Sequence, residues 1–150
     1  MSNRIGIASD HGGKYLKEKM SVFLRSQGWD LVDYGVAVDC QESVDYPDYA
    51  AELARAVSQG RLPRGILICG TGIGMSIAAN KFPAVRAALI WDEFTARMSR
   101  QHNDANILCL GERVLNHDRA LEFLQIWLTT EFEGSRHQRR LDKIRQLEQR

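Results

Sequence analysis

The stretch Gly65–Gly74 reads GILICGTGIG and decides the fold, because an apolar run passes directly into a glycine-rich loop. The run Gly65–Cys69 predicts a β-strand, and a helical pattern follows the loop through Phe82. A strand, a tight loop and a helix in this order form the repeating unit of α/β proteins. The stretch therefore predicts a parallel sheet with helices packed against it.

The same alternation continues on both sides of this stretch. Four further strands are predicted, over Arg4–Ser9, Trp29–Tyr34, Arg86–Ile90 and Ile107–Leu110. Helix signals separate them: Gly28 ends the first helix, Pro47 begins the second, and Asp92 and Asn116 cap two later ones. The pattern predicts a Rossmann-like, doubly wound three-layer α/β/α sandwich with a five-stranded parallel sheet. It forms one domain over residues 1–150, and an extended C-terminal helix covers about 135–150.

The composition excludes several classes of protein. A chain of 150 residues, 44% hydrophobic and 26% charged, has the composition of a single globular domain. Its net charge of +1 provides no overall field that would attract nucleic acid or a membrane surface. No apolar stretch approaches the ~18 residues of a membrane span, and no signal region precedes the first strand. We therefore expect a cytoplasmic protein with neither nucleic-acid nor membrane partners.

The cysteines and histidines argue against disulfides and metals. An odd number of widely spaced cysteines is typical of a reducing compartment, and here they are Cys40, Cys69 and Cys109. The chain has no CxxC motif, and no two histidines stand four residues apart. We therefore expect no zinc site.

Ligands of doubly wound folds bind beyond the carboxyl ends of the strands, which directs attention to two loops. Asp10–Gly13 follows the first strand, and Gly70–Gly74 follows the third. Neither loop matches the phosphate-loop or dinucleotide fingerprint. A receiver domain would have an aspartate in place of Cys69, and a small tyrosine phosphatase an arginine in place of Met75. Four familiar functions of such folds are therefore disfavoured.

Cys69 and the glycines after it have two interpretations. Glycines can fold the backbone tightly and present N–H groups to an anion, either a phosphate or an oxyanion formed during a reaction. The start of a helix next to the thiol would favour its thiolate form. In the alternative, Cys69 is a small buried apolar residue and the glycines only permit close packing.

The C-terminal segment is basic. From Gly134 to Arg150 it has six positive and two negative side chains. Arg136 and Arg140 stand four residues apart near the start of the last helix, where cations are unfavourable unless an anion is bound. They could therefore hold a phosphate between them, although a solvated basic helix face is the alternative.

Two histidines also have a functional and a structural interpretation. His102 follows a helix C-terminus and is either an acid–base group or a capping residue. Asp10 and His11 lie at the tip of the first strand, where they form either an acid–base pair or an N-cap with its neighbour. Their place at the ligand-binding edge favours function.

Several long motifs in fixed order resemble the type B ribose-5-phosphate isomerases, a family that includes galactose-6-phosphate and allose-6-phosphate isomerases. The motifs cover almost the whole chain: Ser9–Gly13 (SDHGG), Asp45–Ala50 (DYPDYA), Cys69–Lys81 (CGTGIGMSIAANK), Ser99–Asn106 (SRQHNDAN) and Gly134–Arg140. The resemblance implies a metal-free and cofactor-free conversion of ribose 5-phosphate into ribulose 5-phosphate through a cis-enediol(ate). This is a reaction of the pentose phosphate pathway.

The resemblance also implies roles for individual residues. Cys69 is the base between C2 and C1, because the glutamate that replaces it in some members would stand at Met75. Thr71 lies beside the thiol, and His102 assists opening of the furanose ring. Asp10 and His11 contact substrate oxygens. The remaining substrate contacts are Gly70, Thr71, Gly72, Ile73 and Gly74 at the enediolate, and Asn103, Arg113, Arg136 and Arg140, whose arginines serve the phosphate.

Other functions stay open at this point. The loop Gly35–Val44 and the pair Trp91–Asp92 leave the choice between pentose and hexose phosphate undecided. A non-catalytic sugar-phosphate sensor on the same fold is a second hypothesis, although a sensor would need the arginines but no thiol base. A nucleic-acid-binding module is a weak third, because the basic charge is confined to the C-terminal segment.

The direction of the helix that precedes His102 predicts that the protein forms a dimer. The helix that ends near Gln101 runs antiparallel to the strands, so His102 and Asn103 should emerge at the opposite edge of the sheet from Cys69. If His102 and Cys69 serve one reaction, His102 must come from a second subunit. We therefore expect a homodimer with shared active sites; pairing of dimers into tetramers is left open.

Overall fold

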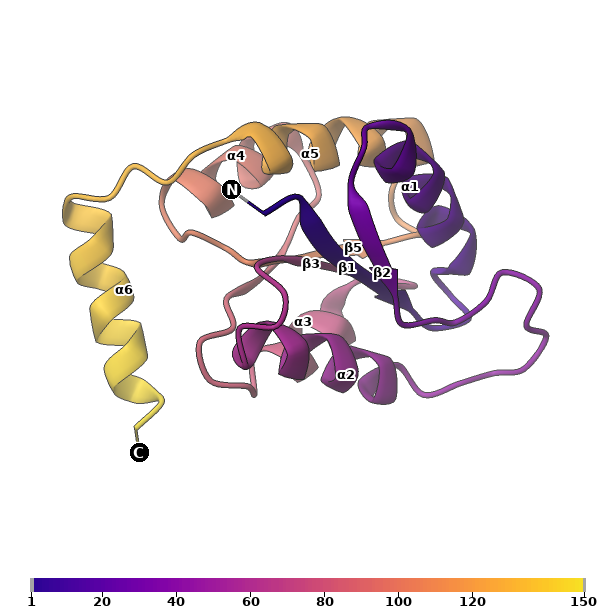
Figure 1. Cartoon of the computed structure of the whole chain (residues 1–150), viewed down its shortest axis with the longest axis horizontal. Coiled ribbons are helices and arrows are strands. Elements are labelled where there is room, and N and C mark those ends of the chain that lie inside the picture. Colours follow the sequence, from indigo (N-terminus) through magenta and orange to yellow (C-terminus); the bar gives the residue numbers. More distant parts are fainter. Residues whose placement is uncertain (1, 150) are drawn as a thin grey trace.

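The computed structural model describes residues 2–149 and contains the alternating elements that the sequence predicts (Figure 1). The strands are β1 Arg4–Ser9, β2 Asp30–Asp33, β3 Gly65–Cys69, β4 Ala87–Leu89 and β5 Ile107–Gly111. The helices are α1 Lys14–Ser26, α2 Tyr46–Ser58, α3 Ile73–Ala79, α4 Glu93–Gln101, α5 His117–Thr129 and α6 Arg136–Leu147. Two strands match their predictions at both ends. Two others are one residue shorter at each end, and β5 is one residue longer at its end.

The sheet has the strand order β2-β1-β3-β5-β4, and every neighbouring pair is parallel. The central strand β3 pairs with β5 along its whole length, from Gly65 opposite Ile107 to Cys69 opposite Gly111. From β1 the chain first adds β2 on one side and later β3 on the other. The loops after β1 and β3 therefore border the crevice in which doubly wound folds bind ligands.

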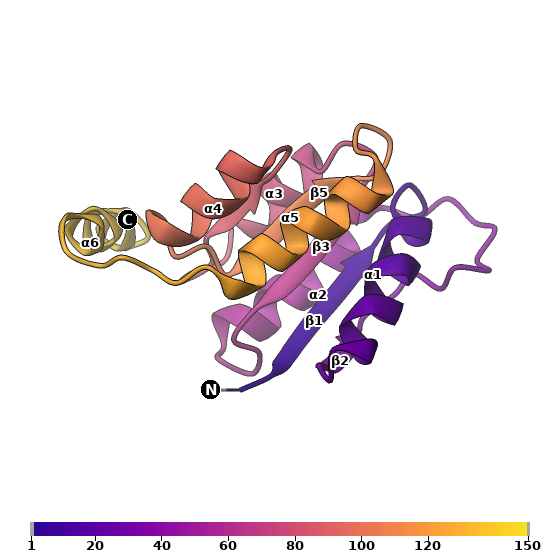
Figure 2. The same ribbon diagram turned by 90° about the horizontal axis from the view of Figure 1, so that it is seen from above.

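Helices cover both faces of the sheet, as predicted (Figure 2). Alternation along β3 sends Ile66 and Ile68 into the core beneath α1, α4 and α5. Leu67 and Cys69 point to the other face, where α2 and α3 form the second core. The Cys69 side chain therefore lies on the same face as α3, the helix that begins just beyond it.

The predicted helix caps are confirmed. The carboxylate of Asp92 accepts a hydrogen bond of 2.7 Å from the backbone of Thr95, whose hydroxyl completes a capping box. The Asn116 side chain caps α5 by accepting from two backbone N–H groups. Pro47 stands in the first turn of α2.

The predicted extent of α3 is wrong, because this helix ends at Ala79 rather than at Phe82. The next residue, Asn80, explains the early end. Its amide donates to the carbonyl of Ala87 and accepts from the same residue's N–H, both at 2.9 Å. The side chain thus joins the end of α3 to the first residue of β4.

The C-terminal helix α6 lies apart from the sandwich, beyond the amino ends of the strands (Figures 1 and 2). It ends at Leu147 rather than at Arg150, which lies outside the described residues. Only His137 and Leu141 of this helix are buried. Near its far end, the Glu148 carboxylate accepts from the N–H of Ala84 at 3.0 Å. No helix within residues 2–149 is both long and apolar enough to cross a membrane.

Candidate active site

Cys69 ends the central strand and is 5% exposed. Its sulfur accepts a hydrogen bond of 3.1 Å from the N–H of Gly72. Gly72 has a φ of +80°, and a Cβ there would lie 2.6 Å from a Leu89 methyl and 2.9 Å from the Leu110 carbonyl carbon. Both the backbone conformation and the space require glycine at this position. The loop therefore turns tightly enough to present an N–H to the thiol.

Asp10 lies beside this loop at the end of β1. The residue is 7% exposed, and its carboxylate accepts a 2.8 Å hydrogen bond from the N–H of Gly12. A Cβ on Gly12 would lie 3.2 Å from the nitrogen of Gly70, so the two loops approach closely because both residues are glycines. The structure thus brings the two loops singled out in the sequence into contact.

Arg113 reaches the same place from the loop after β5. Its N–H donates to the Gly70 carbonyl at 3.0 Å. Its guanidinium lies 3.1 Å from where a Cβ of Gly70 would be, and 3.4 Å from where a Cβ of Gly12 would be. A cation is therefore positioned where the two glycine loops meet, and it can bind an anionic oxygen there.

His11 holds a third segment at this edge. Its Nδ1 accepts a 3.1 Å hydrogen bond from the N–H of Val44, which attaches the loop before α2 to β1. Next to this contact lies an open, polar hollow of about 550 Å³. Its lining consists of Tyr34, Ser43, Val44, Asp45, Asp48, Tyr49 and Glu52. The end of the loop Gly35–Val44 therefore lies beside His11.

Sequence reasoning missed three residues at this edge. The Tyr46 ring covers Gly74, where an added Cβ would lie 2.5 Å from the ring. Gly111 allows the backbone of Thr71 to lie across the end of β5, because a Cβ there would lie 2.6 Å from it. The N–H of Glu112 donates to the Cys69 carbonyl at 2.9 Å. Tyr46 stands inside a quoted motif, whereas the roles of the other two depend on contacts between distant segments.

The other cysteines differ from Cys69. Burial raises the pKa of the Cys109 thiol far above its usual range, and the nearby Cys69 adds to the shift. Cys109 is fully buried in mid-strand and therefore stays a neutral thiol. Met75 is also fully buried, and its thioether offers no proton acceptor.

The remaining predicted residues lie at the opposite end of the sheet. The N–H of Gly65, the first residue of β3, donates to the Asn106 carbonyl at 2.9 Å. The segment that follows α4, with His102 and Asn103, therefore lies beside the beginning of β3, whereas Cys69 lies at its end. At ~3.3 Å per residue these two ends are about 13 Å apart. Arg136 and Arg140 lie on α6, which is also at this amino end.

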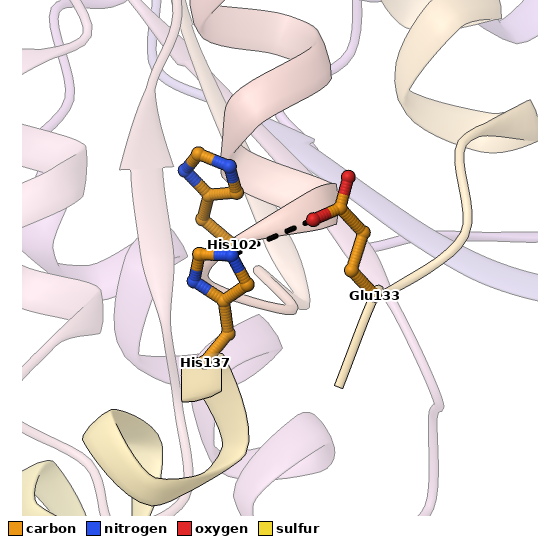
Figure 3. A group of neighbouring side chains, drawn as sticks. All are labelled: His102, Glu133 and His137. Atoms are coloured by element: carbon orange, nitrogen blue, oxygen red, sulfur yellow. Dashed lines mark ion pairs between the residues drawn. The ribbon is translucent and has the colours of Figure 1, made fainter. Parts of the chain in front are cut away.

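His102 is stacked on His137 at this end. The two imidazole centroids are 4.1 Å apart with an interplanar angle of 13°, and His137 Nε2 lies 3.5 Å from a carboxylate oxygen of Glu133 (Figure 3). The ligand atoms of these three residues lie within 4.8 Å of one another. Imidazole binds metals through lone pairs in the ring plane, so two parallel rings cannot aim at one ion without rotating. In this conformation the group is a histidine stack beside a carboxylate.

Burial is the main reason why the pKa of His137 is lowered from its usual value. The positive charges of His102, Arg136 and Arg140 lower it further, and Glu133 acts in the opposite direction. His137 is therefore a neutral imidazole at neutral pH. Sequence reasoning assigned no role to either His137 or Glu133.

Comparisons with known proteins agree with this architecture. The family model described as Ribose/Galactose Isomerase matches residues 5–144. The ribose-5-phosphate isomerase B of Escherichia coli (strain K12) is 43% identical over 147 residues, which cover 98% of this chain and 97% of the relative. The putative sugar phosphate isomerase YwlF of Bacillus subtilis (strain 168) is 50% identical over 147 residues, with 97% of each chain covered.

Solved structures confirm the predicted fold class. The Clostridium thermocellum ribose-5-phosphate isomerase B superposes with a TM-score of 0.94 at 52% identity, over 97% of each chain. The Mycoplasma genitalium ribose-5-phosphate isomerase B with bound ribulose-5-phosphate has a TM-score of 0.92 at 43% identity, over 97% of this chain and 96% of that one. The match to the family model and these similarities over nearly the full length show that this chain belongs to the ribose/galactose isomerase family.

Proposed function

We propose that this chain is an aldose–ketose isomerase that interconverts ribose 5-phosphate and ribulose 5-phosphate through a cis-enediolate. Relatives named ribose-5-phosphate isomerase B support this substrate, and one of them is solved with ribulose-5-phosphate. The observation that carries the proposal is the position of Cys69. The thiol lies at the end of the central strand, a loop N–H contacts it, and Asp10 and Arg113 lie around the same loop.

In the proposed reaction the Cys69 thiolate removes the proton from C2 of the open-chain aldose. The electron pair moves into the C1–C2 bond and the C1 carbonyl oxygen becomes the enediolate oxygen. The proton then returns at C1, and the hydroxyl proton of O2 is transferred to O1, so that the carbonyl forms at C2. Donors on the loop Gly70–Gly74 would stabilise the developing negative charge, and the Thr71 hydroxyl lies on this loop.

The other residues act before and around this step. His102 assists opening of the furanose ring, and Asn103, the residue after it, contacts the substrate. Asp10 and His11 bind sugar oxygens at the carboxyl edge of the sheet. Arg136 and Arg140 hold the phosphate, which takes no part in the proton transfer and so provides binding energy for orientation. Arg113 reaches the glycine loops and binds an anionic substrate oxygen.

We also propose that the active site is shared between two copies in a homodimer. The separation of Cys69 from His102 along β3 supports this, because one chain does not bring both groups to one sugar. Exposed apolar side chains at the carboxyl edge and along α3 offer a surface for the second copy. These are Ile73, Ile77, Trp91, Phe94 and Val114, each more than half exposed.

Incubation with ribose 5-phosphate in deuterated water tests the proposed function. We expect formation of ribulose 5-phosphate with deuterium at the carbon that receives the proton. Allose 6-phosphate and galactose 6-phosphate are assayed in parallel, because the family model covers ribose and galactose isomerases. A higher kcat/KM for a hexose phosphate would replace the pentose assignment. Absence of turnover with all three would overturn the isomerase.

A further inference from the structure

The imidazole ring of His102 is oriented by stacking and not by hydrogen bonds to its nitrogens. Within residues 2–149 hydrogen bonds fix the backbone of His102, through its N–H to Met98 at 2.9 Å, but none fixes its ring. A group that transfers protons during ring opening needs free nitrogens and a fixed orientation. The contact that orients this ring is the stack on His137.

His137 is a buried polar residue on a helix that is largely exposed. It is 2% exposed, although it stands in the first turn of a helix that lies largely in solvent. Its Nε2 is buried without a hydrogen bond, and a carboxylate oxygen of Glu133 lies 3.5 Å from it. A buried polar nitrogen without a partner is costly and requires an explanation. Support of the His102 ring, on which His137 is stacked, provides one.

A backbone hydrogen bond and a turn fix the positions of Glu133 and His137 next to the end of α4. The N–H of Glu133 donates to the carbonyl of Gln101, the residue before His102, at 3.1 Å. The chain then turns through Gly134 and Ser135, with φ of +66° and +55°, and begins α6. His137 therefore lies next to His102 because a backbone hydrogen bond and a sharp turn set its position (Figure 3).

We propose that His137, oriented by Glu133, is a positioning residue for His102. It fixes the plane of the His102 imidazole by face-to-face stacking, leaves both ring nitrogens free for the sugar, and links that plane to the helix that carries Arg136 and Arg140. The ring-opening group and the phosphate-binding arginines thereby keep a constant separation. This proposal rests on the proposed function, in which His102 opens the furanose ring.

The charge of the stack agrees with this role. Burial is the main cause of the lowered pKa of His137, and the positive charges of His102, Arg136 and Arg140 lower it further. The carboxylate of Glu133 acts in the opposite direction and raises it. A neutral His137 stacks beneath His102 without repelling the proton that His102 takes up during the reaction.

The test compares His137→Ala with His137→Phe, which retains a flat ring but has no nitrogen. For His137→Ala we expect kcat/KM to fall at least ~10-fold, because a loosely held acid–base group is out of position for much of the time. His137→Phe should stay within about threefold of the wild type. Glu133→Ala should cause a smaller loss in the same direction. The partly exposed His117 and the exposed Glu131 serve as controls, and His117→Ala and Glu131→Ala should behave like the wild type.

Deuterium exchange shows which step is impaired. The kcat/KM values from ribose 5-phosphate and from ribulose 5-phosphate must fall by the same factor, since their ratio is the equilibrium constant. Ribulose 5-phosphate is open-chain, because its O5 carries the phosphate and its other hydroxyls are too near C2 to close a furanose ring. Exchange of its C1 proton with deuterated water therefore needs Cys69 but no ring step. We expect His137→Ala to retain this exchange within about threefold while net isomerisation falls.

Several outcomes would overturn the proposal. Equal losses of exchange and of isomerisation in His137→Ala would mean that His137 supports the whole site. No rescue by His137→Phe would exclude the stack, and an unchanged kcat/KM in both His137→Ala and Glu133→Ala would exclude any positioning role. If His137→Ala does not fold, Glu133→Ala against Glu131→Ala decides the question by the same exchange ratio. Failure of the wild type to isomerise ribose 5-phosphate would contradict the proposed function instead.

Discussion

The three cysteines show how position determines the chemistry of a side chain. Cys69 accepts a hydrogen bond from the loop N–H of Gly72, and it lies where the two glycine loops meet. Cys109 lies on the neighbouring strand β5, where it pairs with Leu67, two residues before Cys69, and it is fully buried in the apolar core. Cys40 lies in the loop before α2. Of the three thiols, that of Cys69 lies beside the glycine loop, which is why we propose it as the base.

Cys69→Ala should lower kcat at least ~100-fold, because the variant lacks the base, while substrate binding changes only a few-fold. Steady-state kinetics and the binding of a non-reacting phosphorylated sugar alcohol measure the two effects. Cys40→Ala is the matched control and should keep wild-type kinetics. Substantial isomerisation by Cys69→Ala would remove this residue from the role of base.

Arg140→Ala should raise KM about 10-fold with a small change in kcat, because a charge-assisted hydrogen bond to the phosphate is lost. Inhibition by a phosphorylated sugar alcohol should weaken, and inhibition by the unphosphorylated alcohol should not. Arg145→Ala, on the last turn of the same helix, is the control. Equal effects on both inhibitors would contradict a phosphate role for Arg140.

At the scale of elements, local signals predicted most of the boundaries. Capping side chains such as Asp92 and Asn116 act within one turn of their own helix, so the sequence around them is sufficient. The end of α3 depends on a longer contact, because the Asn80 side chain binds the backbone of Ala87 at the start of β4. The His102–His137 stack joins residues of two helices, and no periodicity in the chain indicates it. Tertiary contacts thus determined what the sequence pattern missed.

The Asp92 cap should make the stability of α4 depend on pH. Hydrogen bonds from the Thr95 backbone and side chain lower the pKa of this carboxyl group in the folded state. The cap therefore contributes its full stabilisation above the unfolded pKa of ~3.9 and loses it as the pH falls through the lower folded value. The melting temperature of Asp92→Ala should lie below that of the wild type at pH 7, and the gap should narrow toward pH 3.

Asp45→Ala is the matched control for this experiment, because Asp45 precedes α2 in the same way but makes no capping hydrogen bond with its side chain. Its melting temperature should differ little from that of the wild type at either pH. A gap for Asp92→Ala that stays constant between pH 7 and pH 3 would show that the cap does not act through its charge.

At the scale of the whole molecule, the sequence predicted that Cys69 and His102 lie at opposite ends of the sheet. The direction of α4 relative to the parallel strands was sufficient to place His102 away from Cys69, and the structure agrees. Which surfaces meet in a dimer could not be read from the chain, because apolar residues of the core and of an exposed edge look alike in sequence. Trp91 and Phe94, 59% and 68% exposed, illustrate this.

Mixing two inactive variants tests the shared site. Cys69→Ala and His102→Ala proteins are combined after reversible dissociation, so that half of the dimers contain one chain of each kind when pairing is random. Each mixed dimer has one doubly damaged site and one intact site, and about a quarter of all sites should recover. Mass spectrometry confirms that mixed dimers form. Mixed dimers without recovered activity would mean that each chain builds its own site.

The distance between the two ends of β3 also determines how the specific activity should depend on enzyme concentration. If the group that opens the sugar ring and the group that moves the proton belong to different copies, an isolated chain is inactive. Specific activity is then constant at high enzyme concentration and declines in proportion to concentration once pairs dissociate. Added sugar phosphate bridges both copies, so it should shift this decline to lower concentration and slow the loss of activity in dilute solution.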